Sequence, residues 1–206
     1  MTKSDELRVL ELEVVGDKML PLQGANLVFG EGDVEAKVMC IGEAPGLRED
    51  QQGRPFVGRS GQLLDKLLGS IGWERGSVYI TNIVKRRPPE NRDPLPEEIA
   101  AYKPYLTRQI NIVNPKIIVP LGRFAMNYFL PEGKISRDQG RMFHVEGRHV
   151  YPVFHPAAAL RSTETLRQLE ESFKRLPVEL ERMASSLVAH NSVHAQKSED
   201  MQDHLF

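Results

Sequence analysis

The sequence predicts an α/β fold, a three-layer α-β-α sandwich around a central four-stranded, mainly parallel sheet. Four short runs rich in apolar and β-branched residues, at 37–42, 77–82, 116–121 and 149–154, have the length and composition of buried strands. Helical patterns separate these runs. Strands that alternate with helices indicate a parallel sheet covered by helices on both faces.

The helices are expected in the intervals between the strands. Ser60 can cap the first, in which leucines recur at helical spacing up to Leu68. A second helix opens at Pro96 with two glutamates and runs to about Val113. A short third helix contains the aromatic residues of 124–129. The last carries apolar residues at 166, 169, 173 and 176, and Pro177 is expected to bend or interrupt it.

The chain of 206 residues is long enough for one domain with a substantial core. We assign residues 1–183 to this domain and 184–206 to a polar, mobile C-terminal tail, because the apolar period ends there. No apolar run reaches the length of a membrane span, and the N-terminus does not resemble a signal peptide. The single cysteine, Cys40, suits a reducing compartment, so a cytoplasmic protein is expected.

The net charge of −1 conceals an asymmetry along the chain. Residues 37–161 carry 19 basic and 12 acidic side chains, whereas the flanking segments carry 8 and 16. A basic middle segment can attract a polyanion such as nucleic acid, although a mixed surface without such meaning explains it equally well.

The unusual residues follow the strands directly. The strand that ends at Gly42 is followed by a lone carboxylate, Glu43, on a turn stiffened by Pro45 and Gly46. Asn82 ends the second strand and His155 follows the fourth. Because the carboxyl ends of parallel strands share one sheet edge, these loops are expected to converge on a ligand site.

In order and spacing, five motifs of this chain resemble the family-four uracil-DNA glycosylases over about residues 26–161. The motifs are Gly42-Glu43-Ala44-Pro45-Gly46, Gly53-Arg54-Pro55-Phe56-Val57-Gly58, Thr81-Asn82-Ile83-Val84-Lys85, Arg87-Pro88-Pro89 with Asn91-Arg92-Asp93-Pro94, and His155-Pro156. The resemblance implies a monofunctional enzyme of base excision repair that flips uracil from DNA and hydrolyses its N-glycosidic bond, leaving an abasic site.

The resemblance also assigns roles to residues at the strand ends. Glu43 and His155 would be catalytic: Glu43 orients the attacking water, and His155 donates a hydrogen bond to the departing uracil O2. Gly42, Phe56 and Asn82 would bind the base, with Phe56 stacking on it and the Asn82 amide reading N3–H and O4. Without the resemblance, each of these residues has an ordinary alternative as a turn, cap or core residue.

The chain departs from that family at its cofactor. The family holds a [4Fe–4S] cluster with four cysteines, two of which precede the segment that here begins at Asn26. The other two fall where Arg86 and Tyr102 stand. A cluster needs four thiolates, so we expect neither this cofactor nor a metal. Arg86 and Tyr102 should then be neighbours, with the guanidinium stacked over the ring unless both face solvent.

The remaining candidates concern DNA. A proline-stiffened basic loop is expected to meet phosphates through Lys85, Arg86, Arg87 and Arg92. Ser60 and the amides near Gly58 and Gly61 could hold another phosphate at a helix N-terminus. Either Leu160 or Arg161 would fill the gap left by the flipped base, unless Leu160 packs in the core.

The partners expected are single- or double-stranded DNA that contains uracil, acted on by a monomer. The last five residues, Gln202 to Phe206, resemble a sliding-clamp docking peptide, although three specified positions make a short pattern. Two alternatives stay open. One is a glycosylase that prefers another deaminated base, such as hypoxanthine, and the other is a damage-binding protein that has lost catalysis.

Overall fold

A six-stranded sheet forms the centre of the computed structural model, which describes the backbone of residues 1–202 and the side chains of residues 1–183. Its strand order is β1-β3-β2-β4-β6-β5. The strands are β1 (Glu31–Gly32), β2 (Val38–Gly42), β3 (Tyr79–Asn82), β4 (Ile117–Pro120), β5 (Phe143–Val145) and β6 (Arg148–Val150).

The predicted four-stranded parallel sheet is present as the middle of this larger sheet. β3, β2, β4 and β6 are parallel neighbours, and β1 and β5 add one antiparallel strand at each edge. Every residue of β2, β3 and β4 is buried. Helices cover both faces, which explains why these strands read as apolar runs without alternation.

Helices connect the strands in the expected order. Those that precede β4 are α1 (Lys3–Gly16), α2 (Leu47–Gln52), α3 (Arg59–Ser70) and α4 (Pro96–Val113), with 3₁₀ turns η1 (Arg75–Ser77) and η2 (Pro89–Asn91). Those that follow β4 are α5 (Arg123–Phe129), α6 (Ile135–Asp138), α7 (Pro156–Ala159) and α8 (Thr163–Gln202). The predicted extent of α4 is confirmed.

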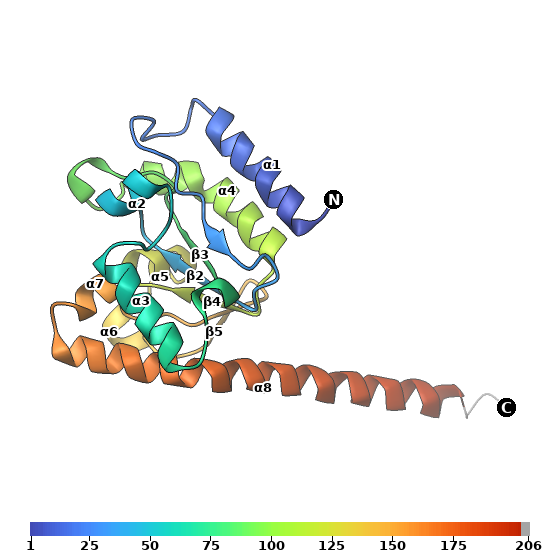
Figure 1. Ribbon diagram of the computed structural model, residues 1–206. Helices are drawn as coiled ribbons and strands as arrows, with labels where there is room; N and C mark the ends of the chain where they lie inside the picture. The colour runs from blue at the N-terminus through green and yellow to red at the C-terminus, as the bar shows by residue number, and fades with distance from the viewer. Residues whose placement is uncertain (203–206) are drawn as a thin grey trace. The chain divides into compact units, whose positions relative to one another are not determined.

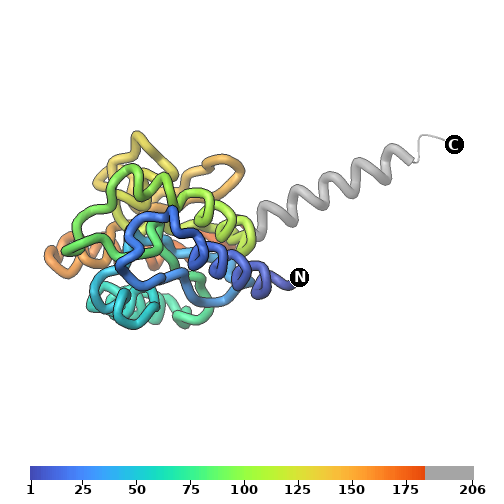
Figure 2. The backbone as a smooth tube through the Cα atoms, turned by 90° about the horizontal axis from the view of Figure 1, so that it is seen from above, coloured from blue at the N-terminus to red at the C-terminus, as the bar shows by residue number. Residues whose placement is uncertain are grey.

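The layers are those of a three-layer sandwich. α1 lies along α4 on one side of the sheet, and α3 lies on the other (Figure 1). Figure 2 shows α1, in blue, next to α4 from a second direction. Leu10 and Val14 of α1 and Leu106 and Ile110 of α4 join strand residues such as Met39 in one apolar core. This burial fixes the sheet and therefore the loops at its carboxyl edge.

Three features of the helices were not expected. The sequence did not indicate α1, whose apolar residues Val9, Leu12 and Val15 are exposed beside its buried ones and blur the helical period. The N-cap of α3 is Gly58, so Ser60 lies in the first turn and does not cap it. Pro177 does not interrupt the last helix, which continues to Gln202.

The chain divides into residues 1–174, which contain the sheet and all the site residues described below, and the segment from Arg175 onward. The mobility expected of residues 184–206 stays a prediction. The clamp-like peptide extends over residues 203–206, which lie outside the described part of the chain. Among the described residues no helix is both long and apolar enough to span a membrane.

Candidate active site

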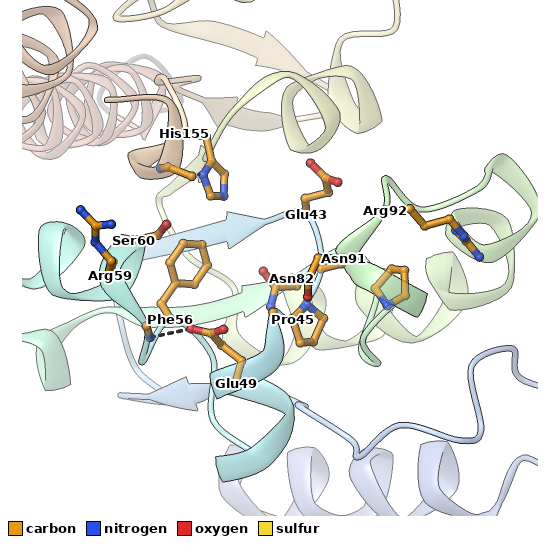
Figure 3. Close-up of a pocket in the computed structure, with 15 residues that line it drawn as sticks. Glu43, Pro45, Glu49, Phe56, Arg59, Ser60, Asn82, Asn91, Arg92 and His155 are labelled. Carbon is orange, nitrogen blue, oxygen red and sulfur yellow. Dashed lines mark hydrogen bonds between the residues drawn. The ribbon is translucent and has the colours of Figure 1, made fainter. Parts of the chain in front are cut away.

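A cavity of about 320 Å³ opens at the carboxyl ends of β2 and β3. The loops that begin at Glu43, Phe56, Pro88 and His155 line it. Figure 3 shows that side chains from these separate loops point into one space. The predicted convergence of the loops on one sheet edge is therefore confirmed, and it follows from the parallel order of the strands.

Phe56 forms one wall of the cavity. Its φ of 51° lies in the left-handed region, which is costly for a residue with a side chain. The ring lies over Gly42, where an added Cβ would be 2.5 Å from Cζ of Phe56. Its centroid is 5.8 Å from that of the His155 ring, at an interplanar angle of 31°. Position 42 must therefore be glycine for the aromatic wall to form.

Asn82 is the last residue of β3 and is 2% exposed. Its Oδ1 is buried and has no hydrogen-bond partner, and the residue lines the cavity. An unpartnered buried acceptor costs free energy of about 1–3 kcal/mol unless a ligand supplies a donor. The amide therefore fits a ligand that carries an N–H group.

His155 faces Phe56 and is the N-cap of α7. The amide of Ala157 donates to its Nδ1 at 3.0 Å, so a neutral ring carries its proton on Nε2. Burial lowers the pKa of His155 to about 4, although Glu49 opposes this shift. Gly122, with φ of 89°, packs against the ring. The site thus holds a neutral imidazole N–H donor at neutral pH.

Glu43 follows β2 directly, and its backbone is fixed because the amide of Val84 donates to its carbonyl at 3.0 Å. Burial raises the pKa of the Glu43 carboxyl to about 7, and the negative charge of Asp93 adds to the shift. Arg123 acts in the opposite direction. A carboxyl with this pKa can exchange a proton with water near neutral pH.

Glu49 is a residue of the cavity that the sequence did not single out, because it lies in a run of charged residues, Arg48-Glu49-Asp50, that is typical of a solvated surface. Its Oε1 accepts hydrogen bonds from the amides of Val57 at 2.8 Å and Gly58 at 2.7 Å, and it lines the cavity. The acid fixes the segment that follows Phe56. Because it occupies the Gly58 amide, the phosphate site expected at that amide is not free.

Lys85 was expected to contact DNA, which the structure contradicts. Its side chain is fully buried, and Nζ donates to Thr81 Oγ1 at 2.5 Å, the Asn82 carbonyl at 2.8 Å and Gln109 Oε1 at 2.5 Å. Burial lowers the pKa of Lys85 well below its ordinary range. This lysine fixes the backbone under Asn82 and cannot reach a phosphate.

Arg86 is also misassigned as a DNA contact. It is 7% exposed, and Nη1 donates to the Ala25 carbonyl at 2.6 Å. The expectation that Arg86 and Tyr102 are neighbours is confirmed, because the guanidinium hydrogen-bonds to Tyr102 and opposes the burial that raises its pKa to about 12. Among the described side chains no cation–π pair involves the two, so the expected stacking is absent.

The other predicted DNA contacts are Arg87, Arg92, Ser60, Leu160 and Arg161. Nε of Arg87 donates to Asn91 Oδ1 at 2.7 Å, and Arg92 forms a two-point ion pair with Glu98 at 2.8 and 2.6 Å. Arg92 and Ser60 line the cavity. Beyond α7, Leu160 is 42% exposed and is therefore not a core residue, and Arg161 is exposed as well.

Comparison with known proteins gives a consistent result. The family model of the uracil DNA glycosylase superfamily matches residues 29–177. The chain is 44% identical to the type-4 uracil-DNA glycosylase of Sulfurisphaera tokodaii, with 84% of each chain covered. It is 43% identical to the type-4 enzyme of Thermotoga maritima, over 73% of this chain and 84% of that one. Identity to the type-5 enzyme of Thermus thermophilus is 29%, over 78% and 81%.

Proposed function

The chain belongs to the uracil-DNA glycosylase superfamily, and on this premise we propose that it removes uracil from DNA by hydrolysis of the N-glycosidic bond. The observation that carries this proposal is the buried, unpartnered Oδ1 of Asn82, a residue that lines the cavity. Uracil has an N3–H donor that this oxygen can accept, and an O4 acceptor for the amide nitrogen.

Recognition requires that the base leave the helix, because its Watson–Crick edge is otherwise paired. In the cavity the flipped uracil stacks on Phe56 while Asn82 reads its edge. Gly42 packs closely against both the Phe56 ring and the Asn82 side chain, which fixes the position of one relative to the other. A geometry set before binding reduces the ordering cost when the base enters.

His155 acts on the leaving group. As the glycosidic bond breaks, negative charge grows on uracil O2, and the Nε2–H of the neutral ring donates to it. A neutral donor suffices because the interaction strengthens with the developing charge. Glu43, in its ionised form, orients the attacking water and stabilises the positive charge on the sugar.

We further propose that the enzyme is monofunctional. A strand-cleaving glycosylase needs an amine nucleophile, and the described lining of the cavity contains no lysine. Lys85, which the motif places nearby, is held by three acceptors beneath Asn82. Water is then the nucleophile, and the product is an intact strand with an abasic site.

For DNA binding we propose that Leu160 or Arg161 enters the gap left by the base, because both are exposed just beyond the catalytic histidine. Arg87, Arg92 and Ser60 supply phosphate contacts at the rim of the cavity. The enzyme would act as a monomer. The peptide Gln202 to Phe206 would dock on a sliding clamp, and its deletion should abolish clamp binding but spare uracil excision.

We propose that the enzyme works without the iron–sulfur cluster of its type-4 relatives. The residues at the corresponding positions do not suit one: Arg86 and Tyr102 bring a guanidinium and a hydroxyl in place of thiolates. Tyr102 donates to the Pro21 carbonyl at 2.8 Å and Arg86 to that of Ala25, so both brace residues 21–25. Iron chelation should leave the melting temperature unchanged, and a fall would contradict this proposal.

The activity is tested with single- and double-stranded oligonucleotides that carry one uracil. Wild-type protein should yield a strand that breaks only after alkali treatment. His155→Ala should slow excision by about 10²–10³-fold, the usual loss for one oxyanion donor. Lys103→Ala, outside the cavity, serves as control. No abasic product from wild type would overturn the proposal, and breakage without alkali would overturn the monofunctional mechanism.

A further inference from the structure

Arg75 reaches the Phe56 segment from the 3₁₀ turn that precedes β3. Its Nη2 donates to the carbonyl of Pro55 at 2.5 Å and its Nη1 to the carbonyl of Phe56 at 3.2 Å. Both acceptors belong to the backbone that carries the aromatic wall of the cavity. Arg75 itself is not among the residues that line the cavity.

Two carboxylates fix the Arg75 guanidinium. Glu31 accepts from Nε at 2.9 Å and lies 2.8 Å from Nη2, and Asp65 of α3 accepts from Nη1 at 2.7 Å. The side chains of Arg75 and Glu31 are only 21% and 24% exposed. A planar guanidinium with partners on several edges has little freedom to rotate, so the two carbonyls it binds are held in place.

The Phe56 segment needs such a support. The left-handed φ of 51° at Phe56 is unfavourable for a residue with a Cβ and persists only when the surroundings enforce it. On one side Glu49 holds the amides of Val57 and Gly58. On the other, Arg75 holds the carbonyls of residues 55 and 56. The segment is thus held from both sides.

We propose that Arg75 is a positioning residue for catalysis, which keeps the Phe56 ring in place to stack on the flipped base. The inference rests on the proposed function, since it assumes that Phe56 meets uracil. Arg75 does not touch the substrate, so its effect passes through Phe56.

The chain offers a matched control in Arg54. Arg54 also pairs with Glu31, at 2.7 and 3.1 Å, but no hydrogen bond joins its described side chain to the Phe56 segment. Arg54→Ala therefore removes an ion pair with the same acid and spares the two carbonyls. Well below the melting temperature, Arg75→Ala should lower the single-turnover rate of uracil excision by about tenfold, with a change below threefold in DNA affinity. The single-turnover rate of Arg54→Ala should stay within twofold of the wild-type rate.

A double-mutant cycle separates positioning from general stability. In a Phe56→Leu background, Arg75→Ala should lower the single-turnover rate by less than a further twofold, because the ring that Arg75 positions is absent. A tenfold loss in both backgrounds, or a wild-type rate for Arg75→Ala, would overturn the proposal. If Arg75→Ala does not fold, Arg75→Lys replaces it, since an ammonium keeps the charge but loses the fork.

Hydrogen exchange supplies a readout that does not depend on activity. The amides of Val57 and Gly58 should exchange at least fivefold faster in the Arg75→Ala protein than in the Arg54→Ala protein. Equal exchange would overturn the role of Arg75 in holding the segment. If wild type fails to excise uracil while these amides respond as expected, the proposed function fails and the support of the segment stands.

Discussion

Two charged neighbours of Glu43 shift the pKa of its carboxyl in opposite directions. Asp93 helps to raise the pKa of the Glu43 carboxyl to about 7, and Arg123 lowers it. The two neighbours also lie 3.9 Å from each other. Since water positioning requires the ionised carboxylate, the fraction of competent enzyme should follow this titration.

The pH profile of kcat/KM should therefore rise through about pH 7. Asp93→Asn removes a negative charge and should move the midpoint to lower pH. Arg123→Gln removes a positive charge and should move it to higher pH. The measurement is uracil excision between pH 5 and 9 for the three proteins (a range of roughly two units on either side). A flat wild-type profile, or shifts in the same direction, would contradict the role of Glu43.

His155 and Glu43, the two groups that we propose to be catalytic, should also affect the pH dependence of stability with opposite signs. The folded state lowers the pKa of His155 from 6.5 to about 4, so its contribution to unfolding free energy falls as pH drops through that window. The folded state raises the pKa of Glu43 from 4.5 to about 7, so its contribution falls as pH rises through that window.

When one of the two groups is replaced, the pH dependence of the free energy of unfolding should reflect the group that remains. Denaturant titrations at several pH values measure this dependence. The free energy of unfolding of His155→Asn, taken relative to that of wild type, should be higher at pH 4.5 than at pH 7. The expected change in this difference is roughly 3 kcal/mol, at about 1.4 kcal/mol per pKa unit. Glu43→Gln should show the reverse. Identical pH dependence in all three proteins would contradict the burial of these groups in the native state.

At the residue scale, the sequence predicted that Glu43, Asn82 and His155 meet at one cavity, because the motif order places them after neighbouring strands. It could not predict which basic residues meet solvent. Lys85 and Arg86 follow β3 in a row of three cations, a pattern typical of a phosphate-binding loop, yet both are buried. Their burial depends on distant partners such as Gln109 and Ala25, which no local pattern reveals.

At the element scale, the first turn of α3 lies in close contact with the Phe56 carbonyl. A Cβ at Gly61 would lie 1.7 Å from that oxygen, whereas nothing lies within 4 Å of a Cβ at Gly69 in the same helix. Gly61 is therefore required for the close approach of α3 to the Phe56 segment. At Gly69 a side chain can be accommodated, because no close contact occurs there.

Alanine at these two glycines should give opposite results in chemical denaturation and excision assays. Gly69→Ala should stabilise the protein by roughly 0.5–1 kcal/mol and leave activity unchanged, because it lowers the backbone entropy of the unfolded chain. Gly61→Ala should destabilise it and reduce excision. A Gly61→Ala protein with wild-type stability would contradict the close approach of α3 to Phe56.

The exposed Leu160 after α7 gives a second prediction at this scale. If it fills the gap left by the base, Leu160→Ala should slow excision from duplex DNA more than from single strands, by about fivefold. Leu12→Ala, a change of an exposed leucine on α1, is the control. Equal losses on both substrates would exclude Leu160 as the wedge and leave Arg161.

β2, β3 and β4 were predicted to within two residues, since each is a continuous buried apolar run. The strand predicted at 149–154 is β6, Arg148–Val150, and beyond it only an isolated bridge joins Val153 to Leu121. The edge strands β1 and β5 were not predicted, because two and three residues cannot display a period. Pro177 shows the converse limit: proline disfavours a helix interior, yet α8 continues through it.

For the molecule as a whole, residues 21–25 are held by hydrogen bonds from α4 and from the loop that follows β3, where relatives use metal ligation. The Tyr102 hydroxyl reaches Pro21, and the Arg86 guanidinium reaches Ala25. Tyr102 is fully buried, so the bond is shielded from water. This bracing keeps residues 21–25 against α4 and the loop that follows β3.

Tyr102→Phe removes the hydrogen bonds of this hydroxyl to Pro21 and Arg86, so it should lower the free energy of unfolding by at least about 1 kcal/mol, the usual net value of one hydrogen bond. The matched control is Tyr128→Phe, because the Tyr128 hydroxyl has contacts no closer than 3.5 Å and should lose almost nothing. Denaturant melts of both variants give the comparison. Equal losses would contradict the bracing role of Tyr102.

The proposed function requires that this cavity accept uracil through Asn82. Its most direct test is the single-turnover release of free base from otherwise identical duplexes that contain either uracil or hypoxanthine. We predict rapid release of uracil, slower release of hypoxanthine, and a loss of at least about 100-fold for uracil in Asn82→Ala, since its bidentate reading of the base would vanish. Preferential release of hypoxanthine, or full uracil release by Asn82→Ala, would contradict the account.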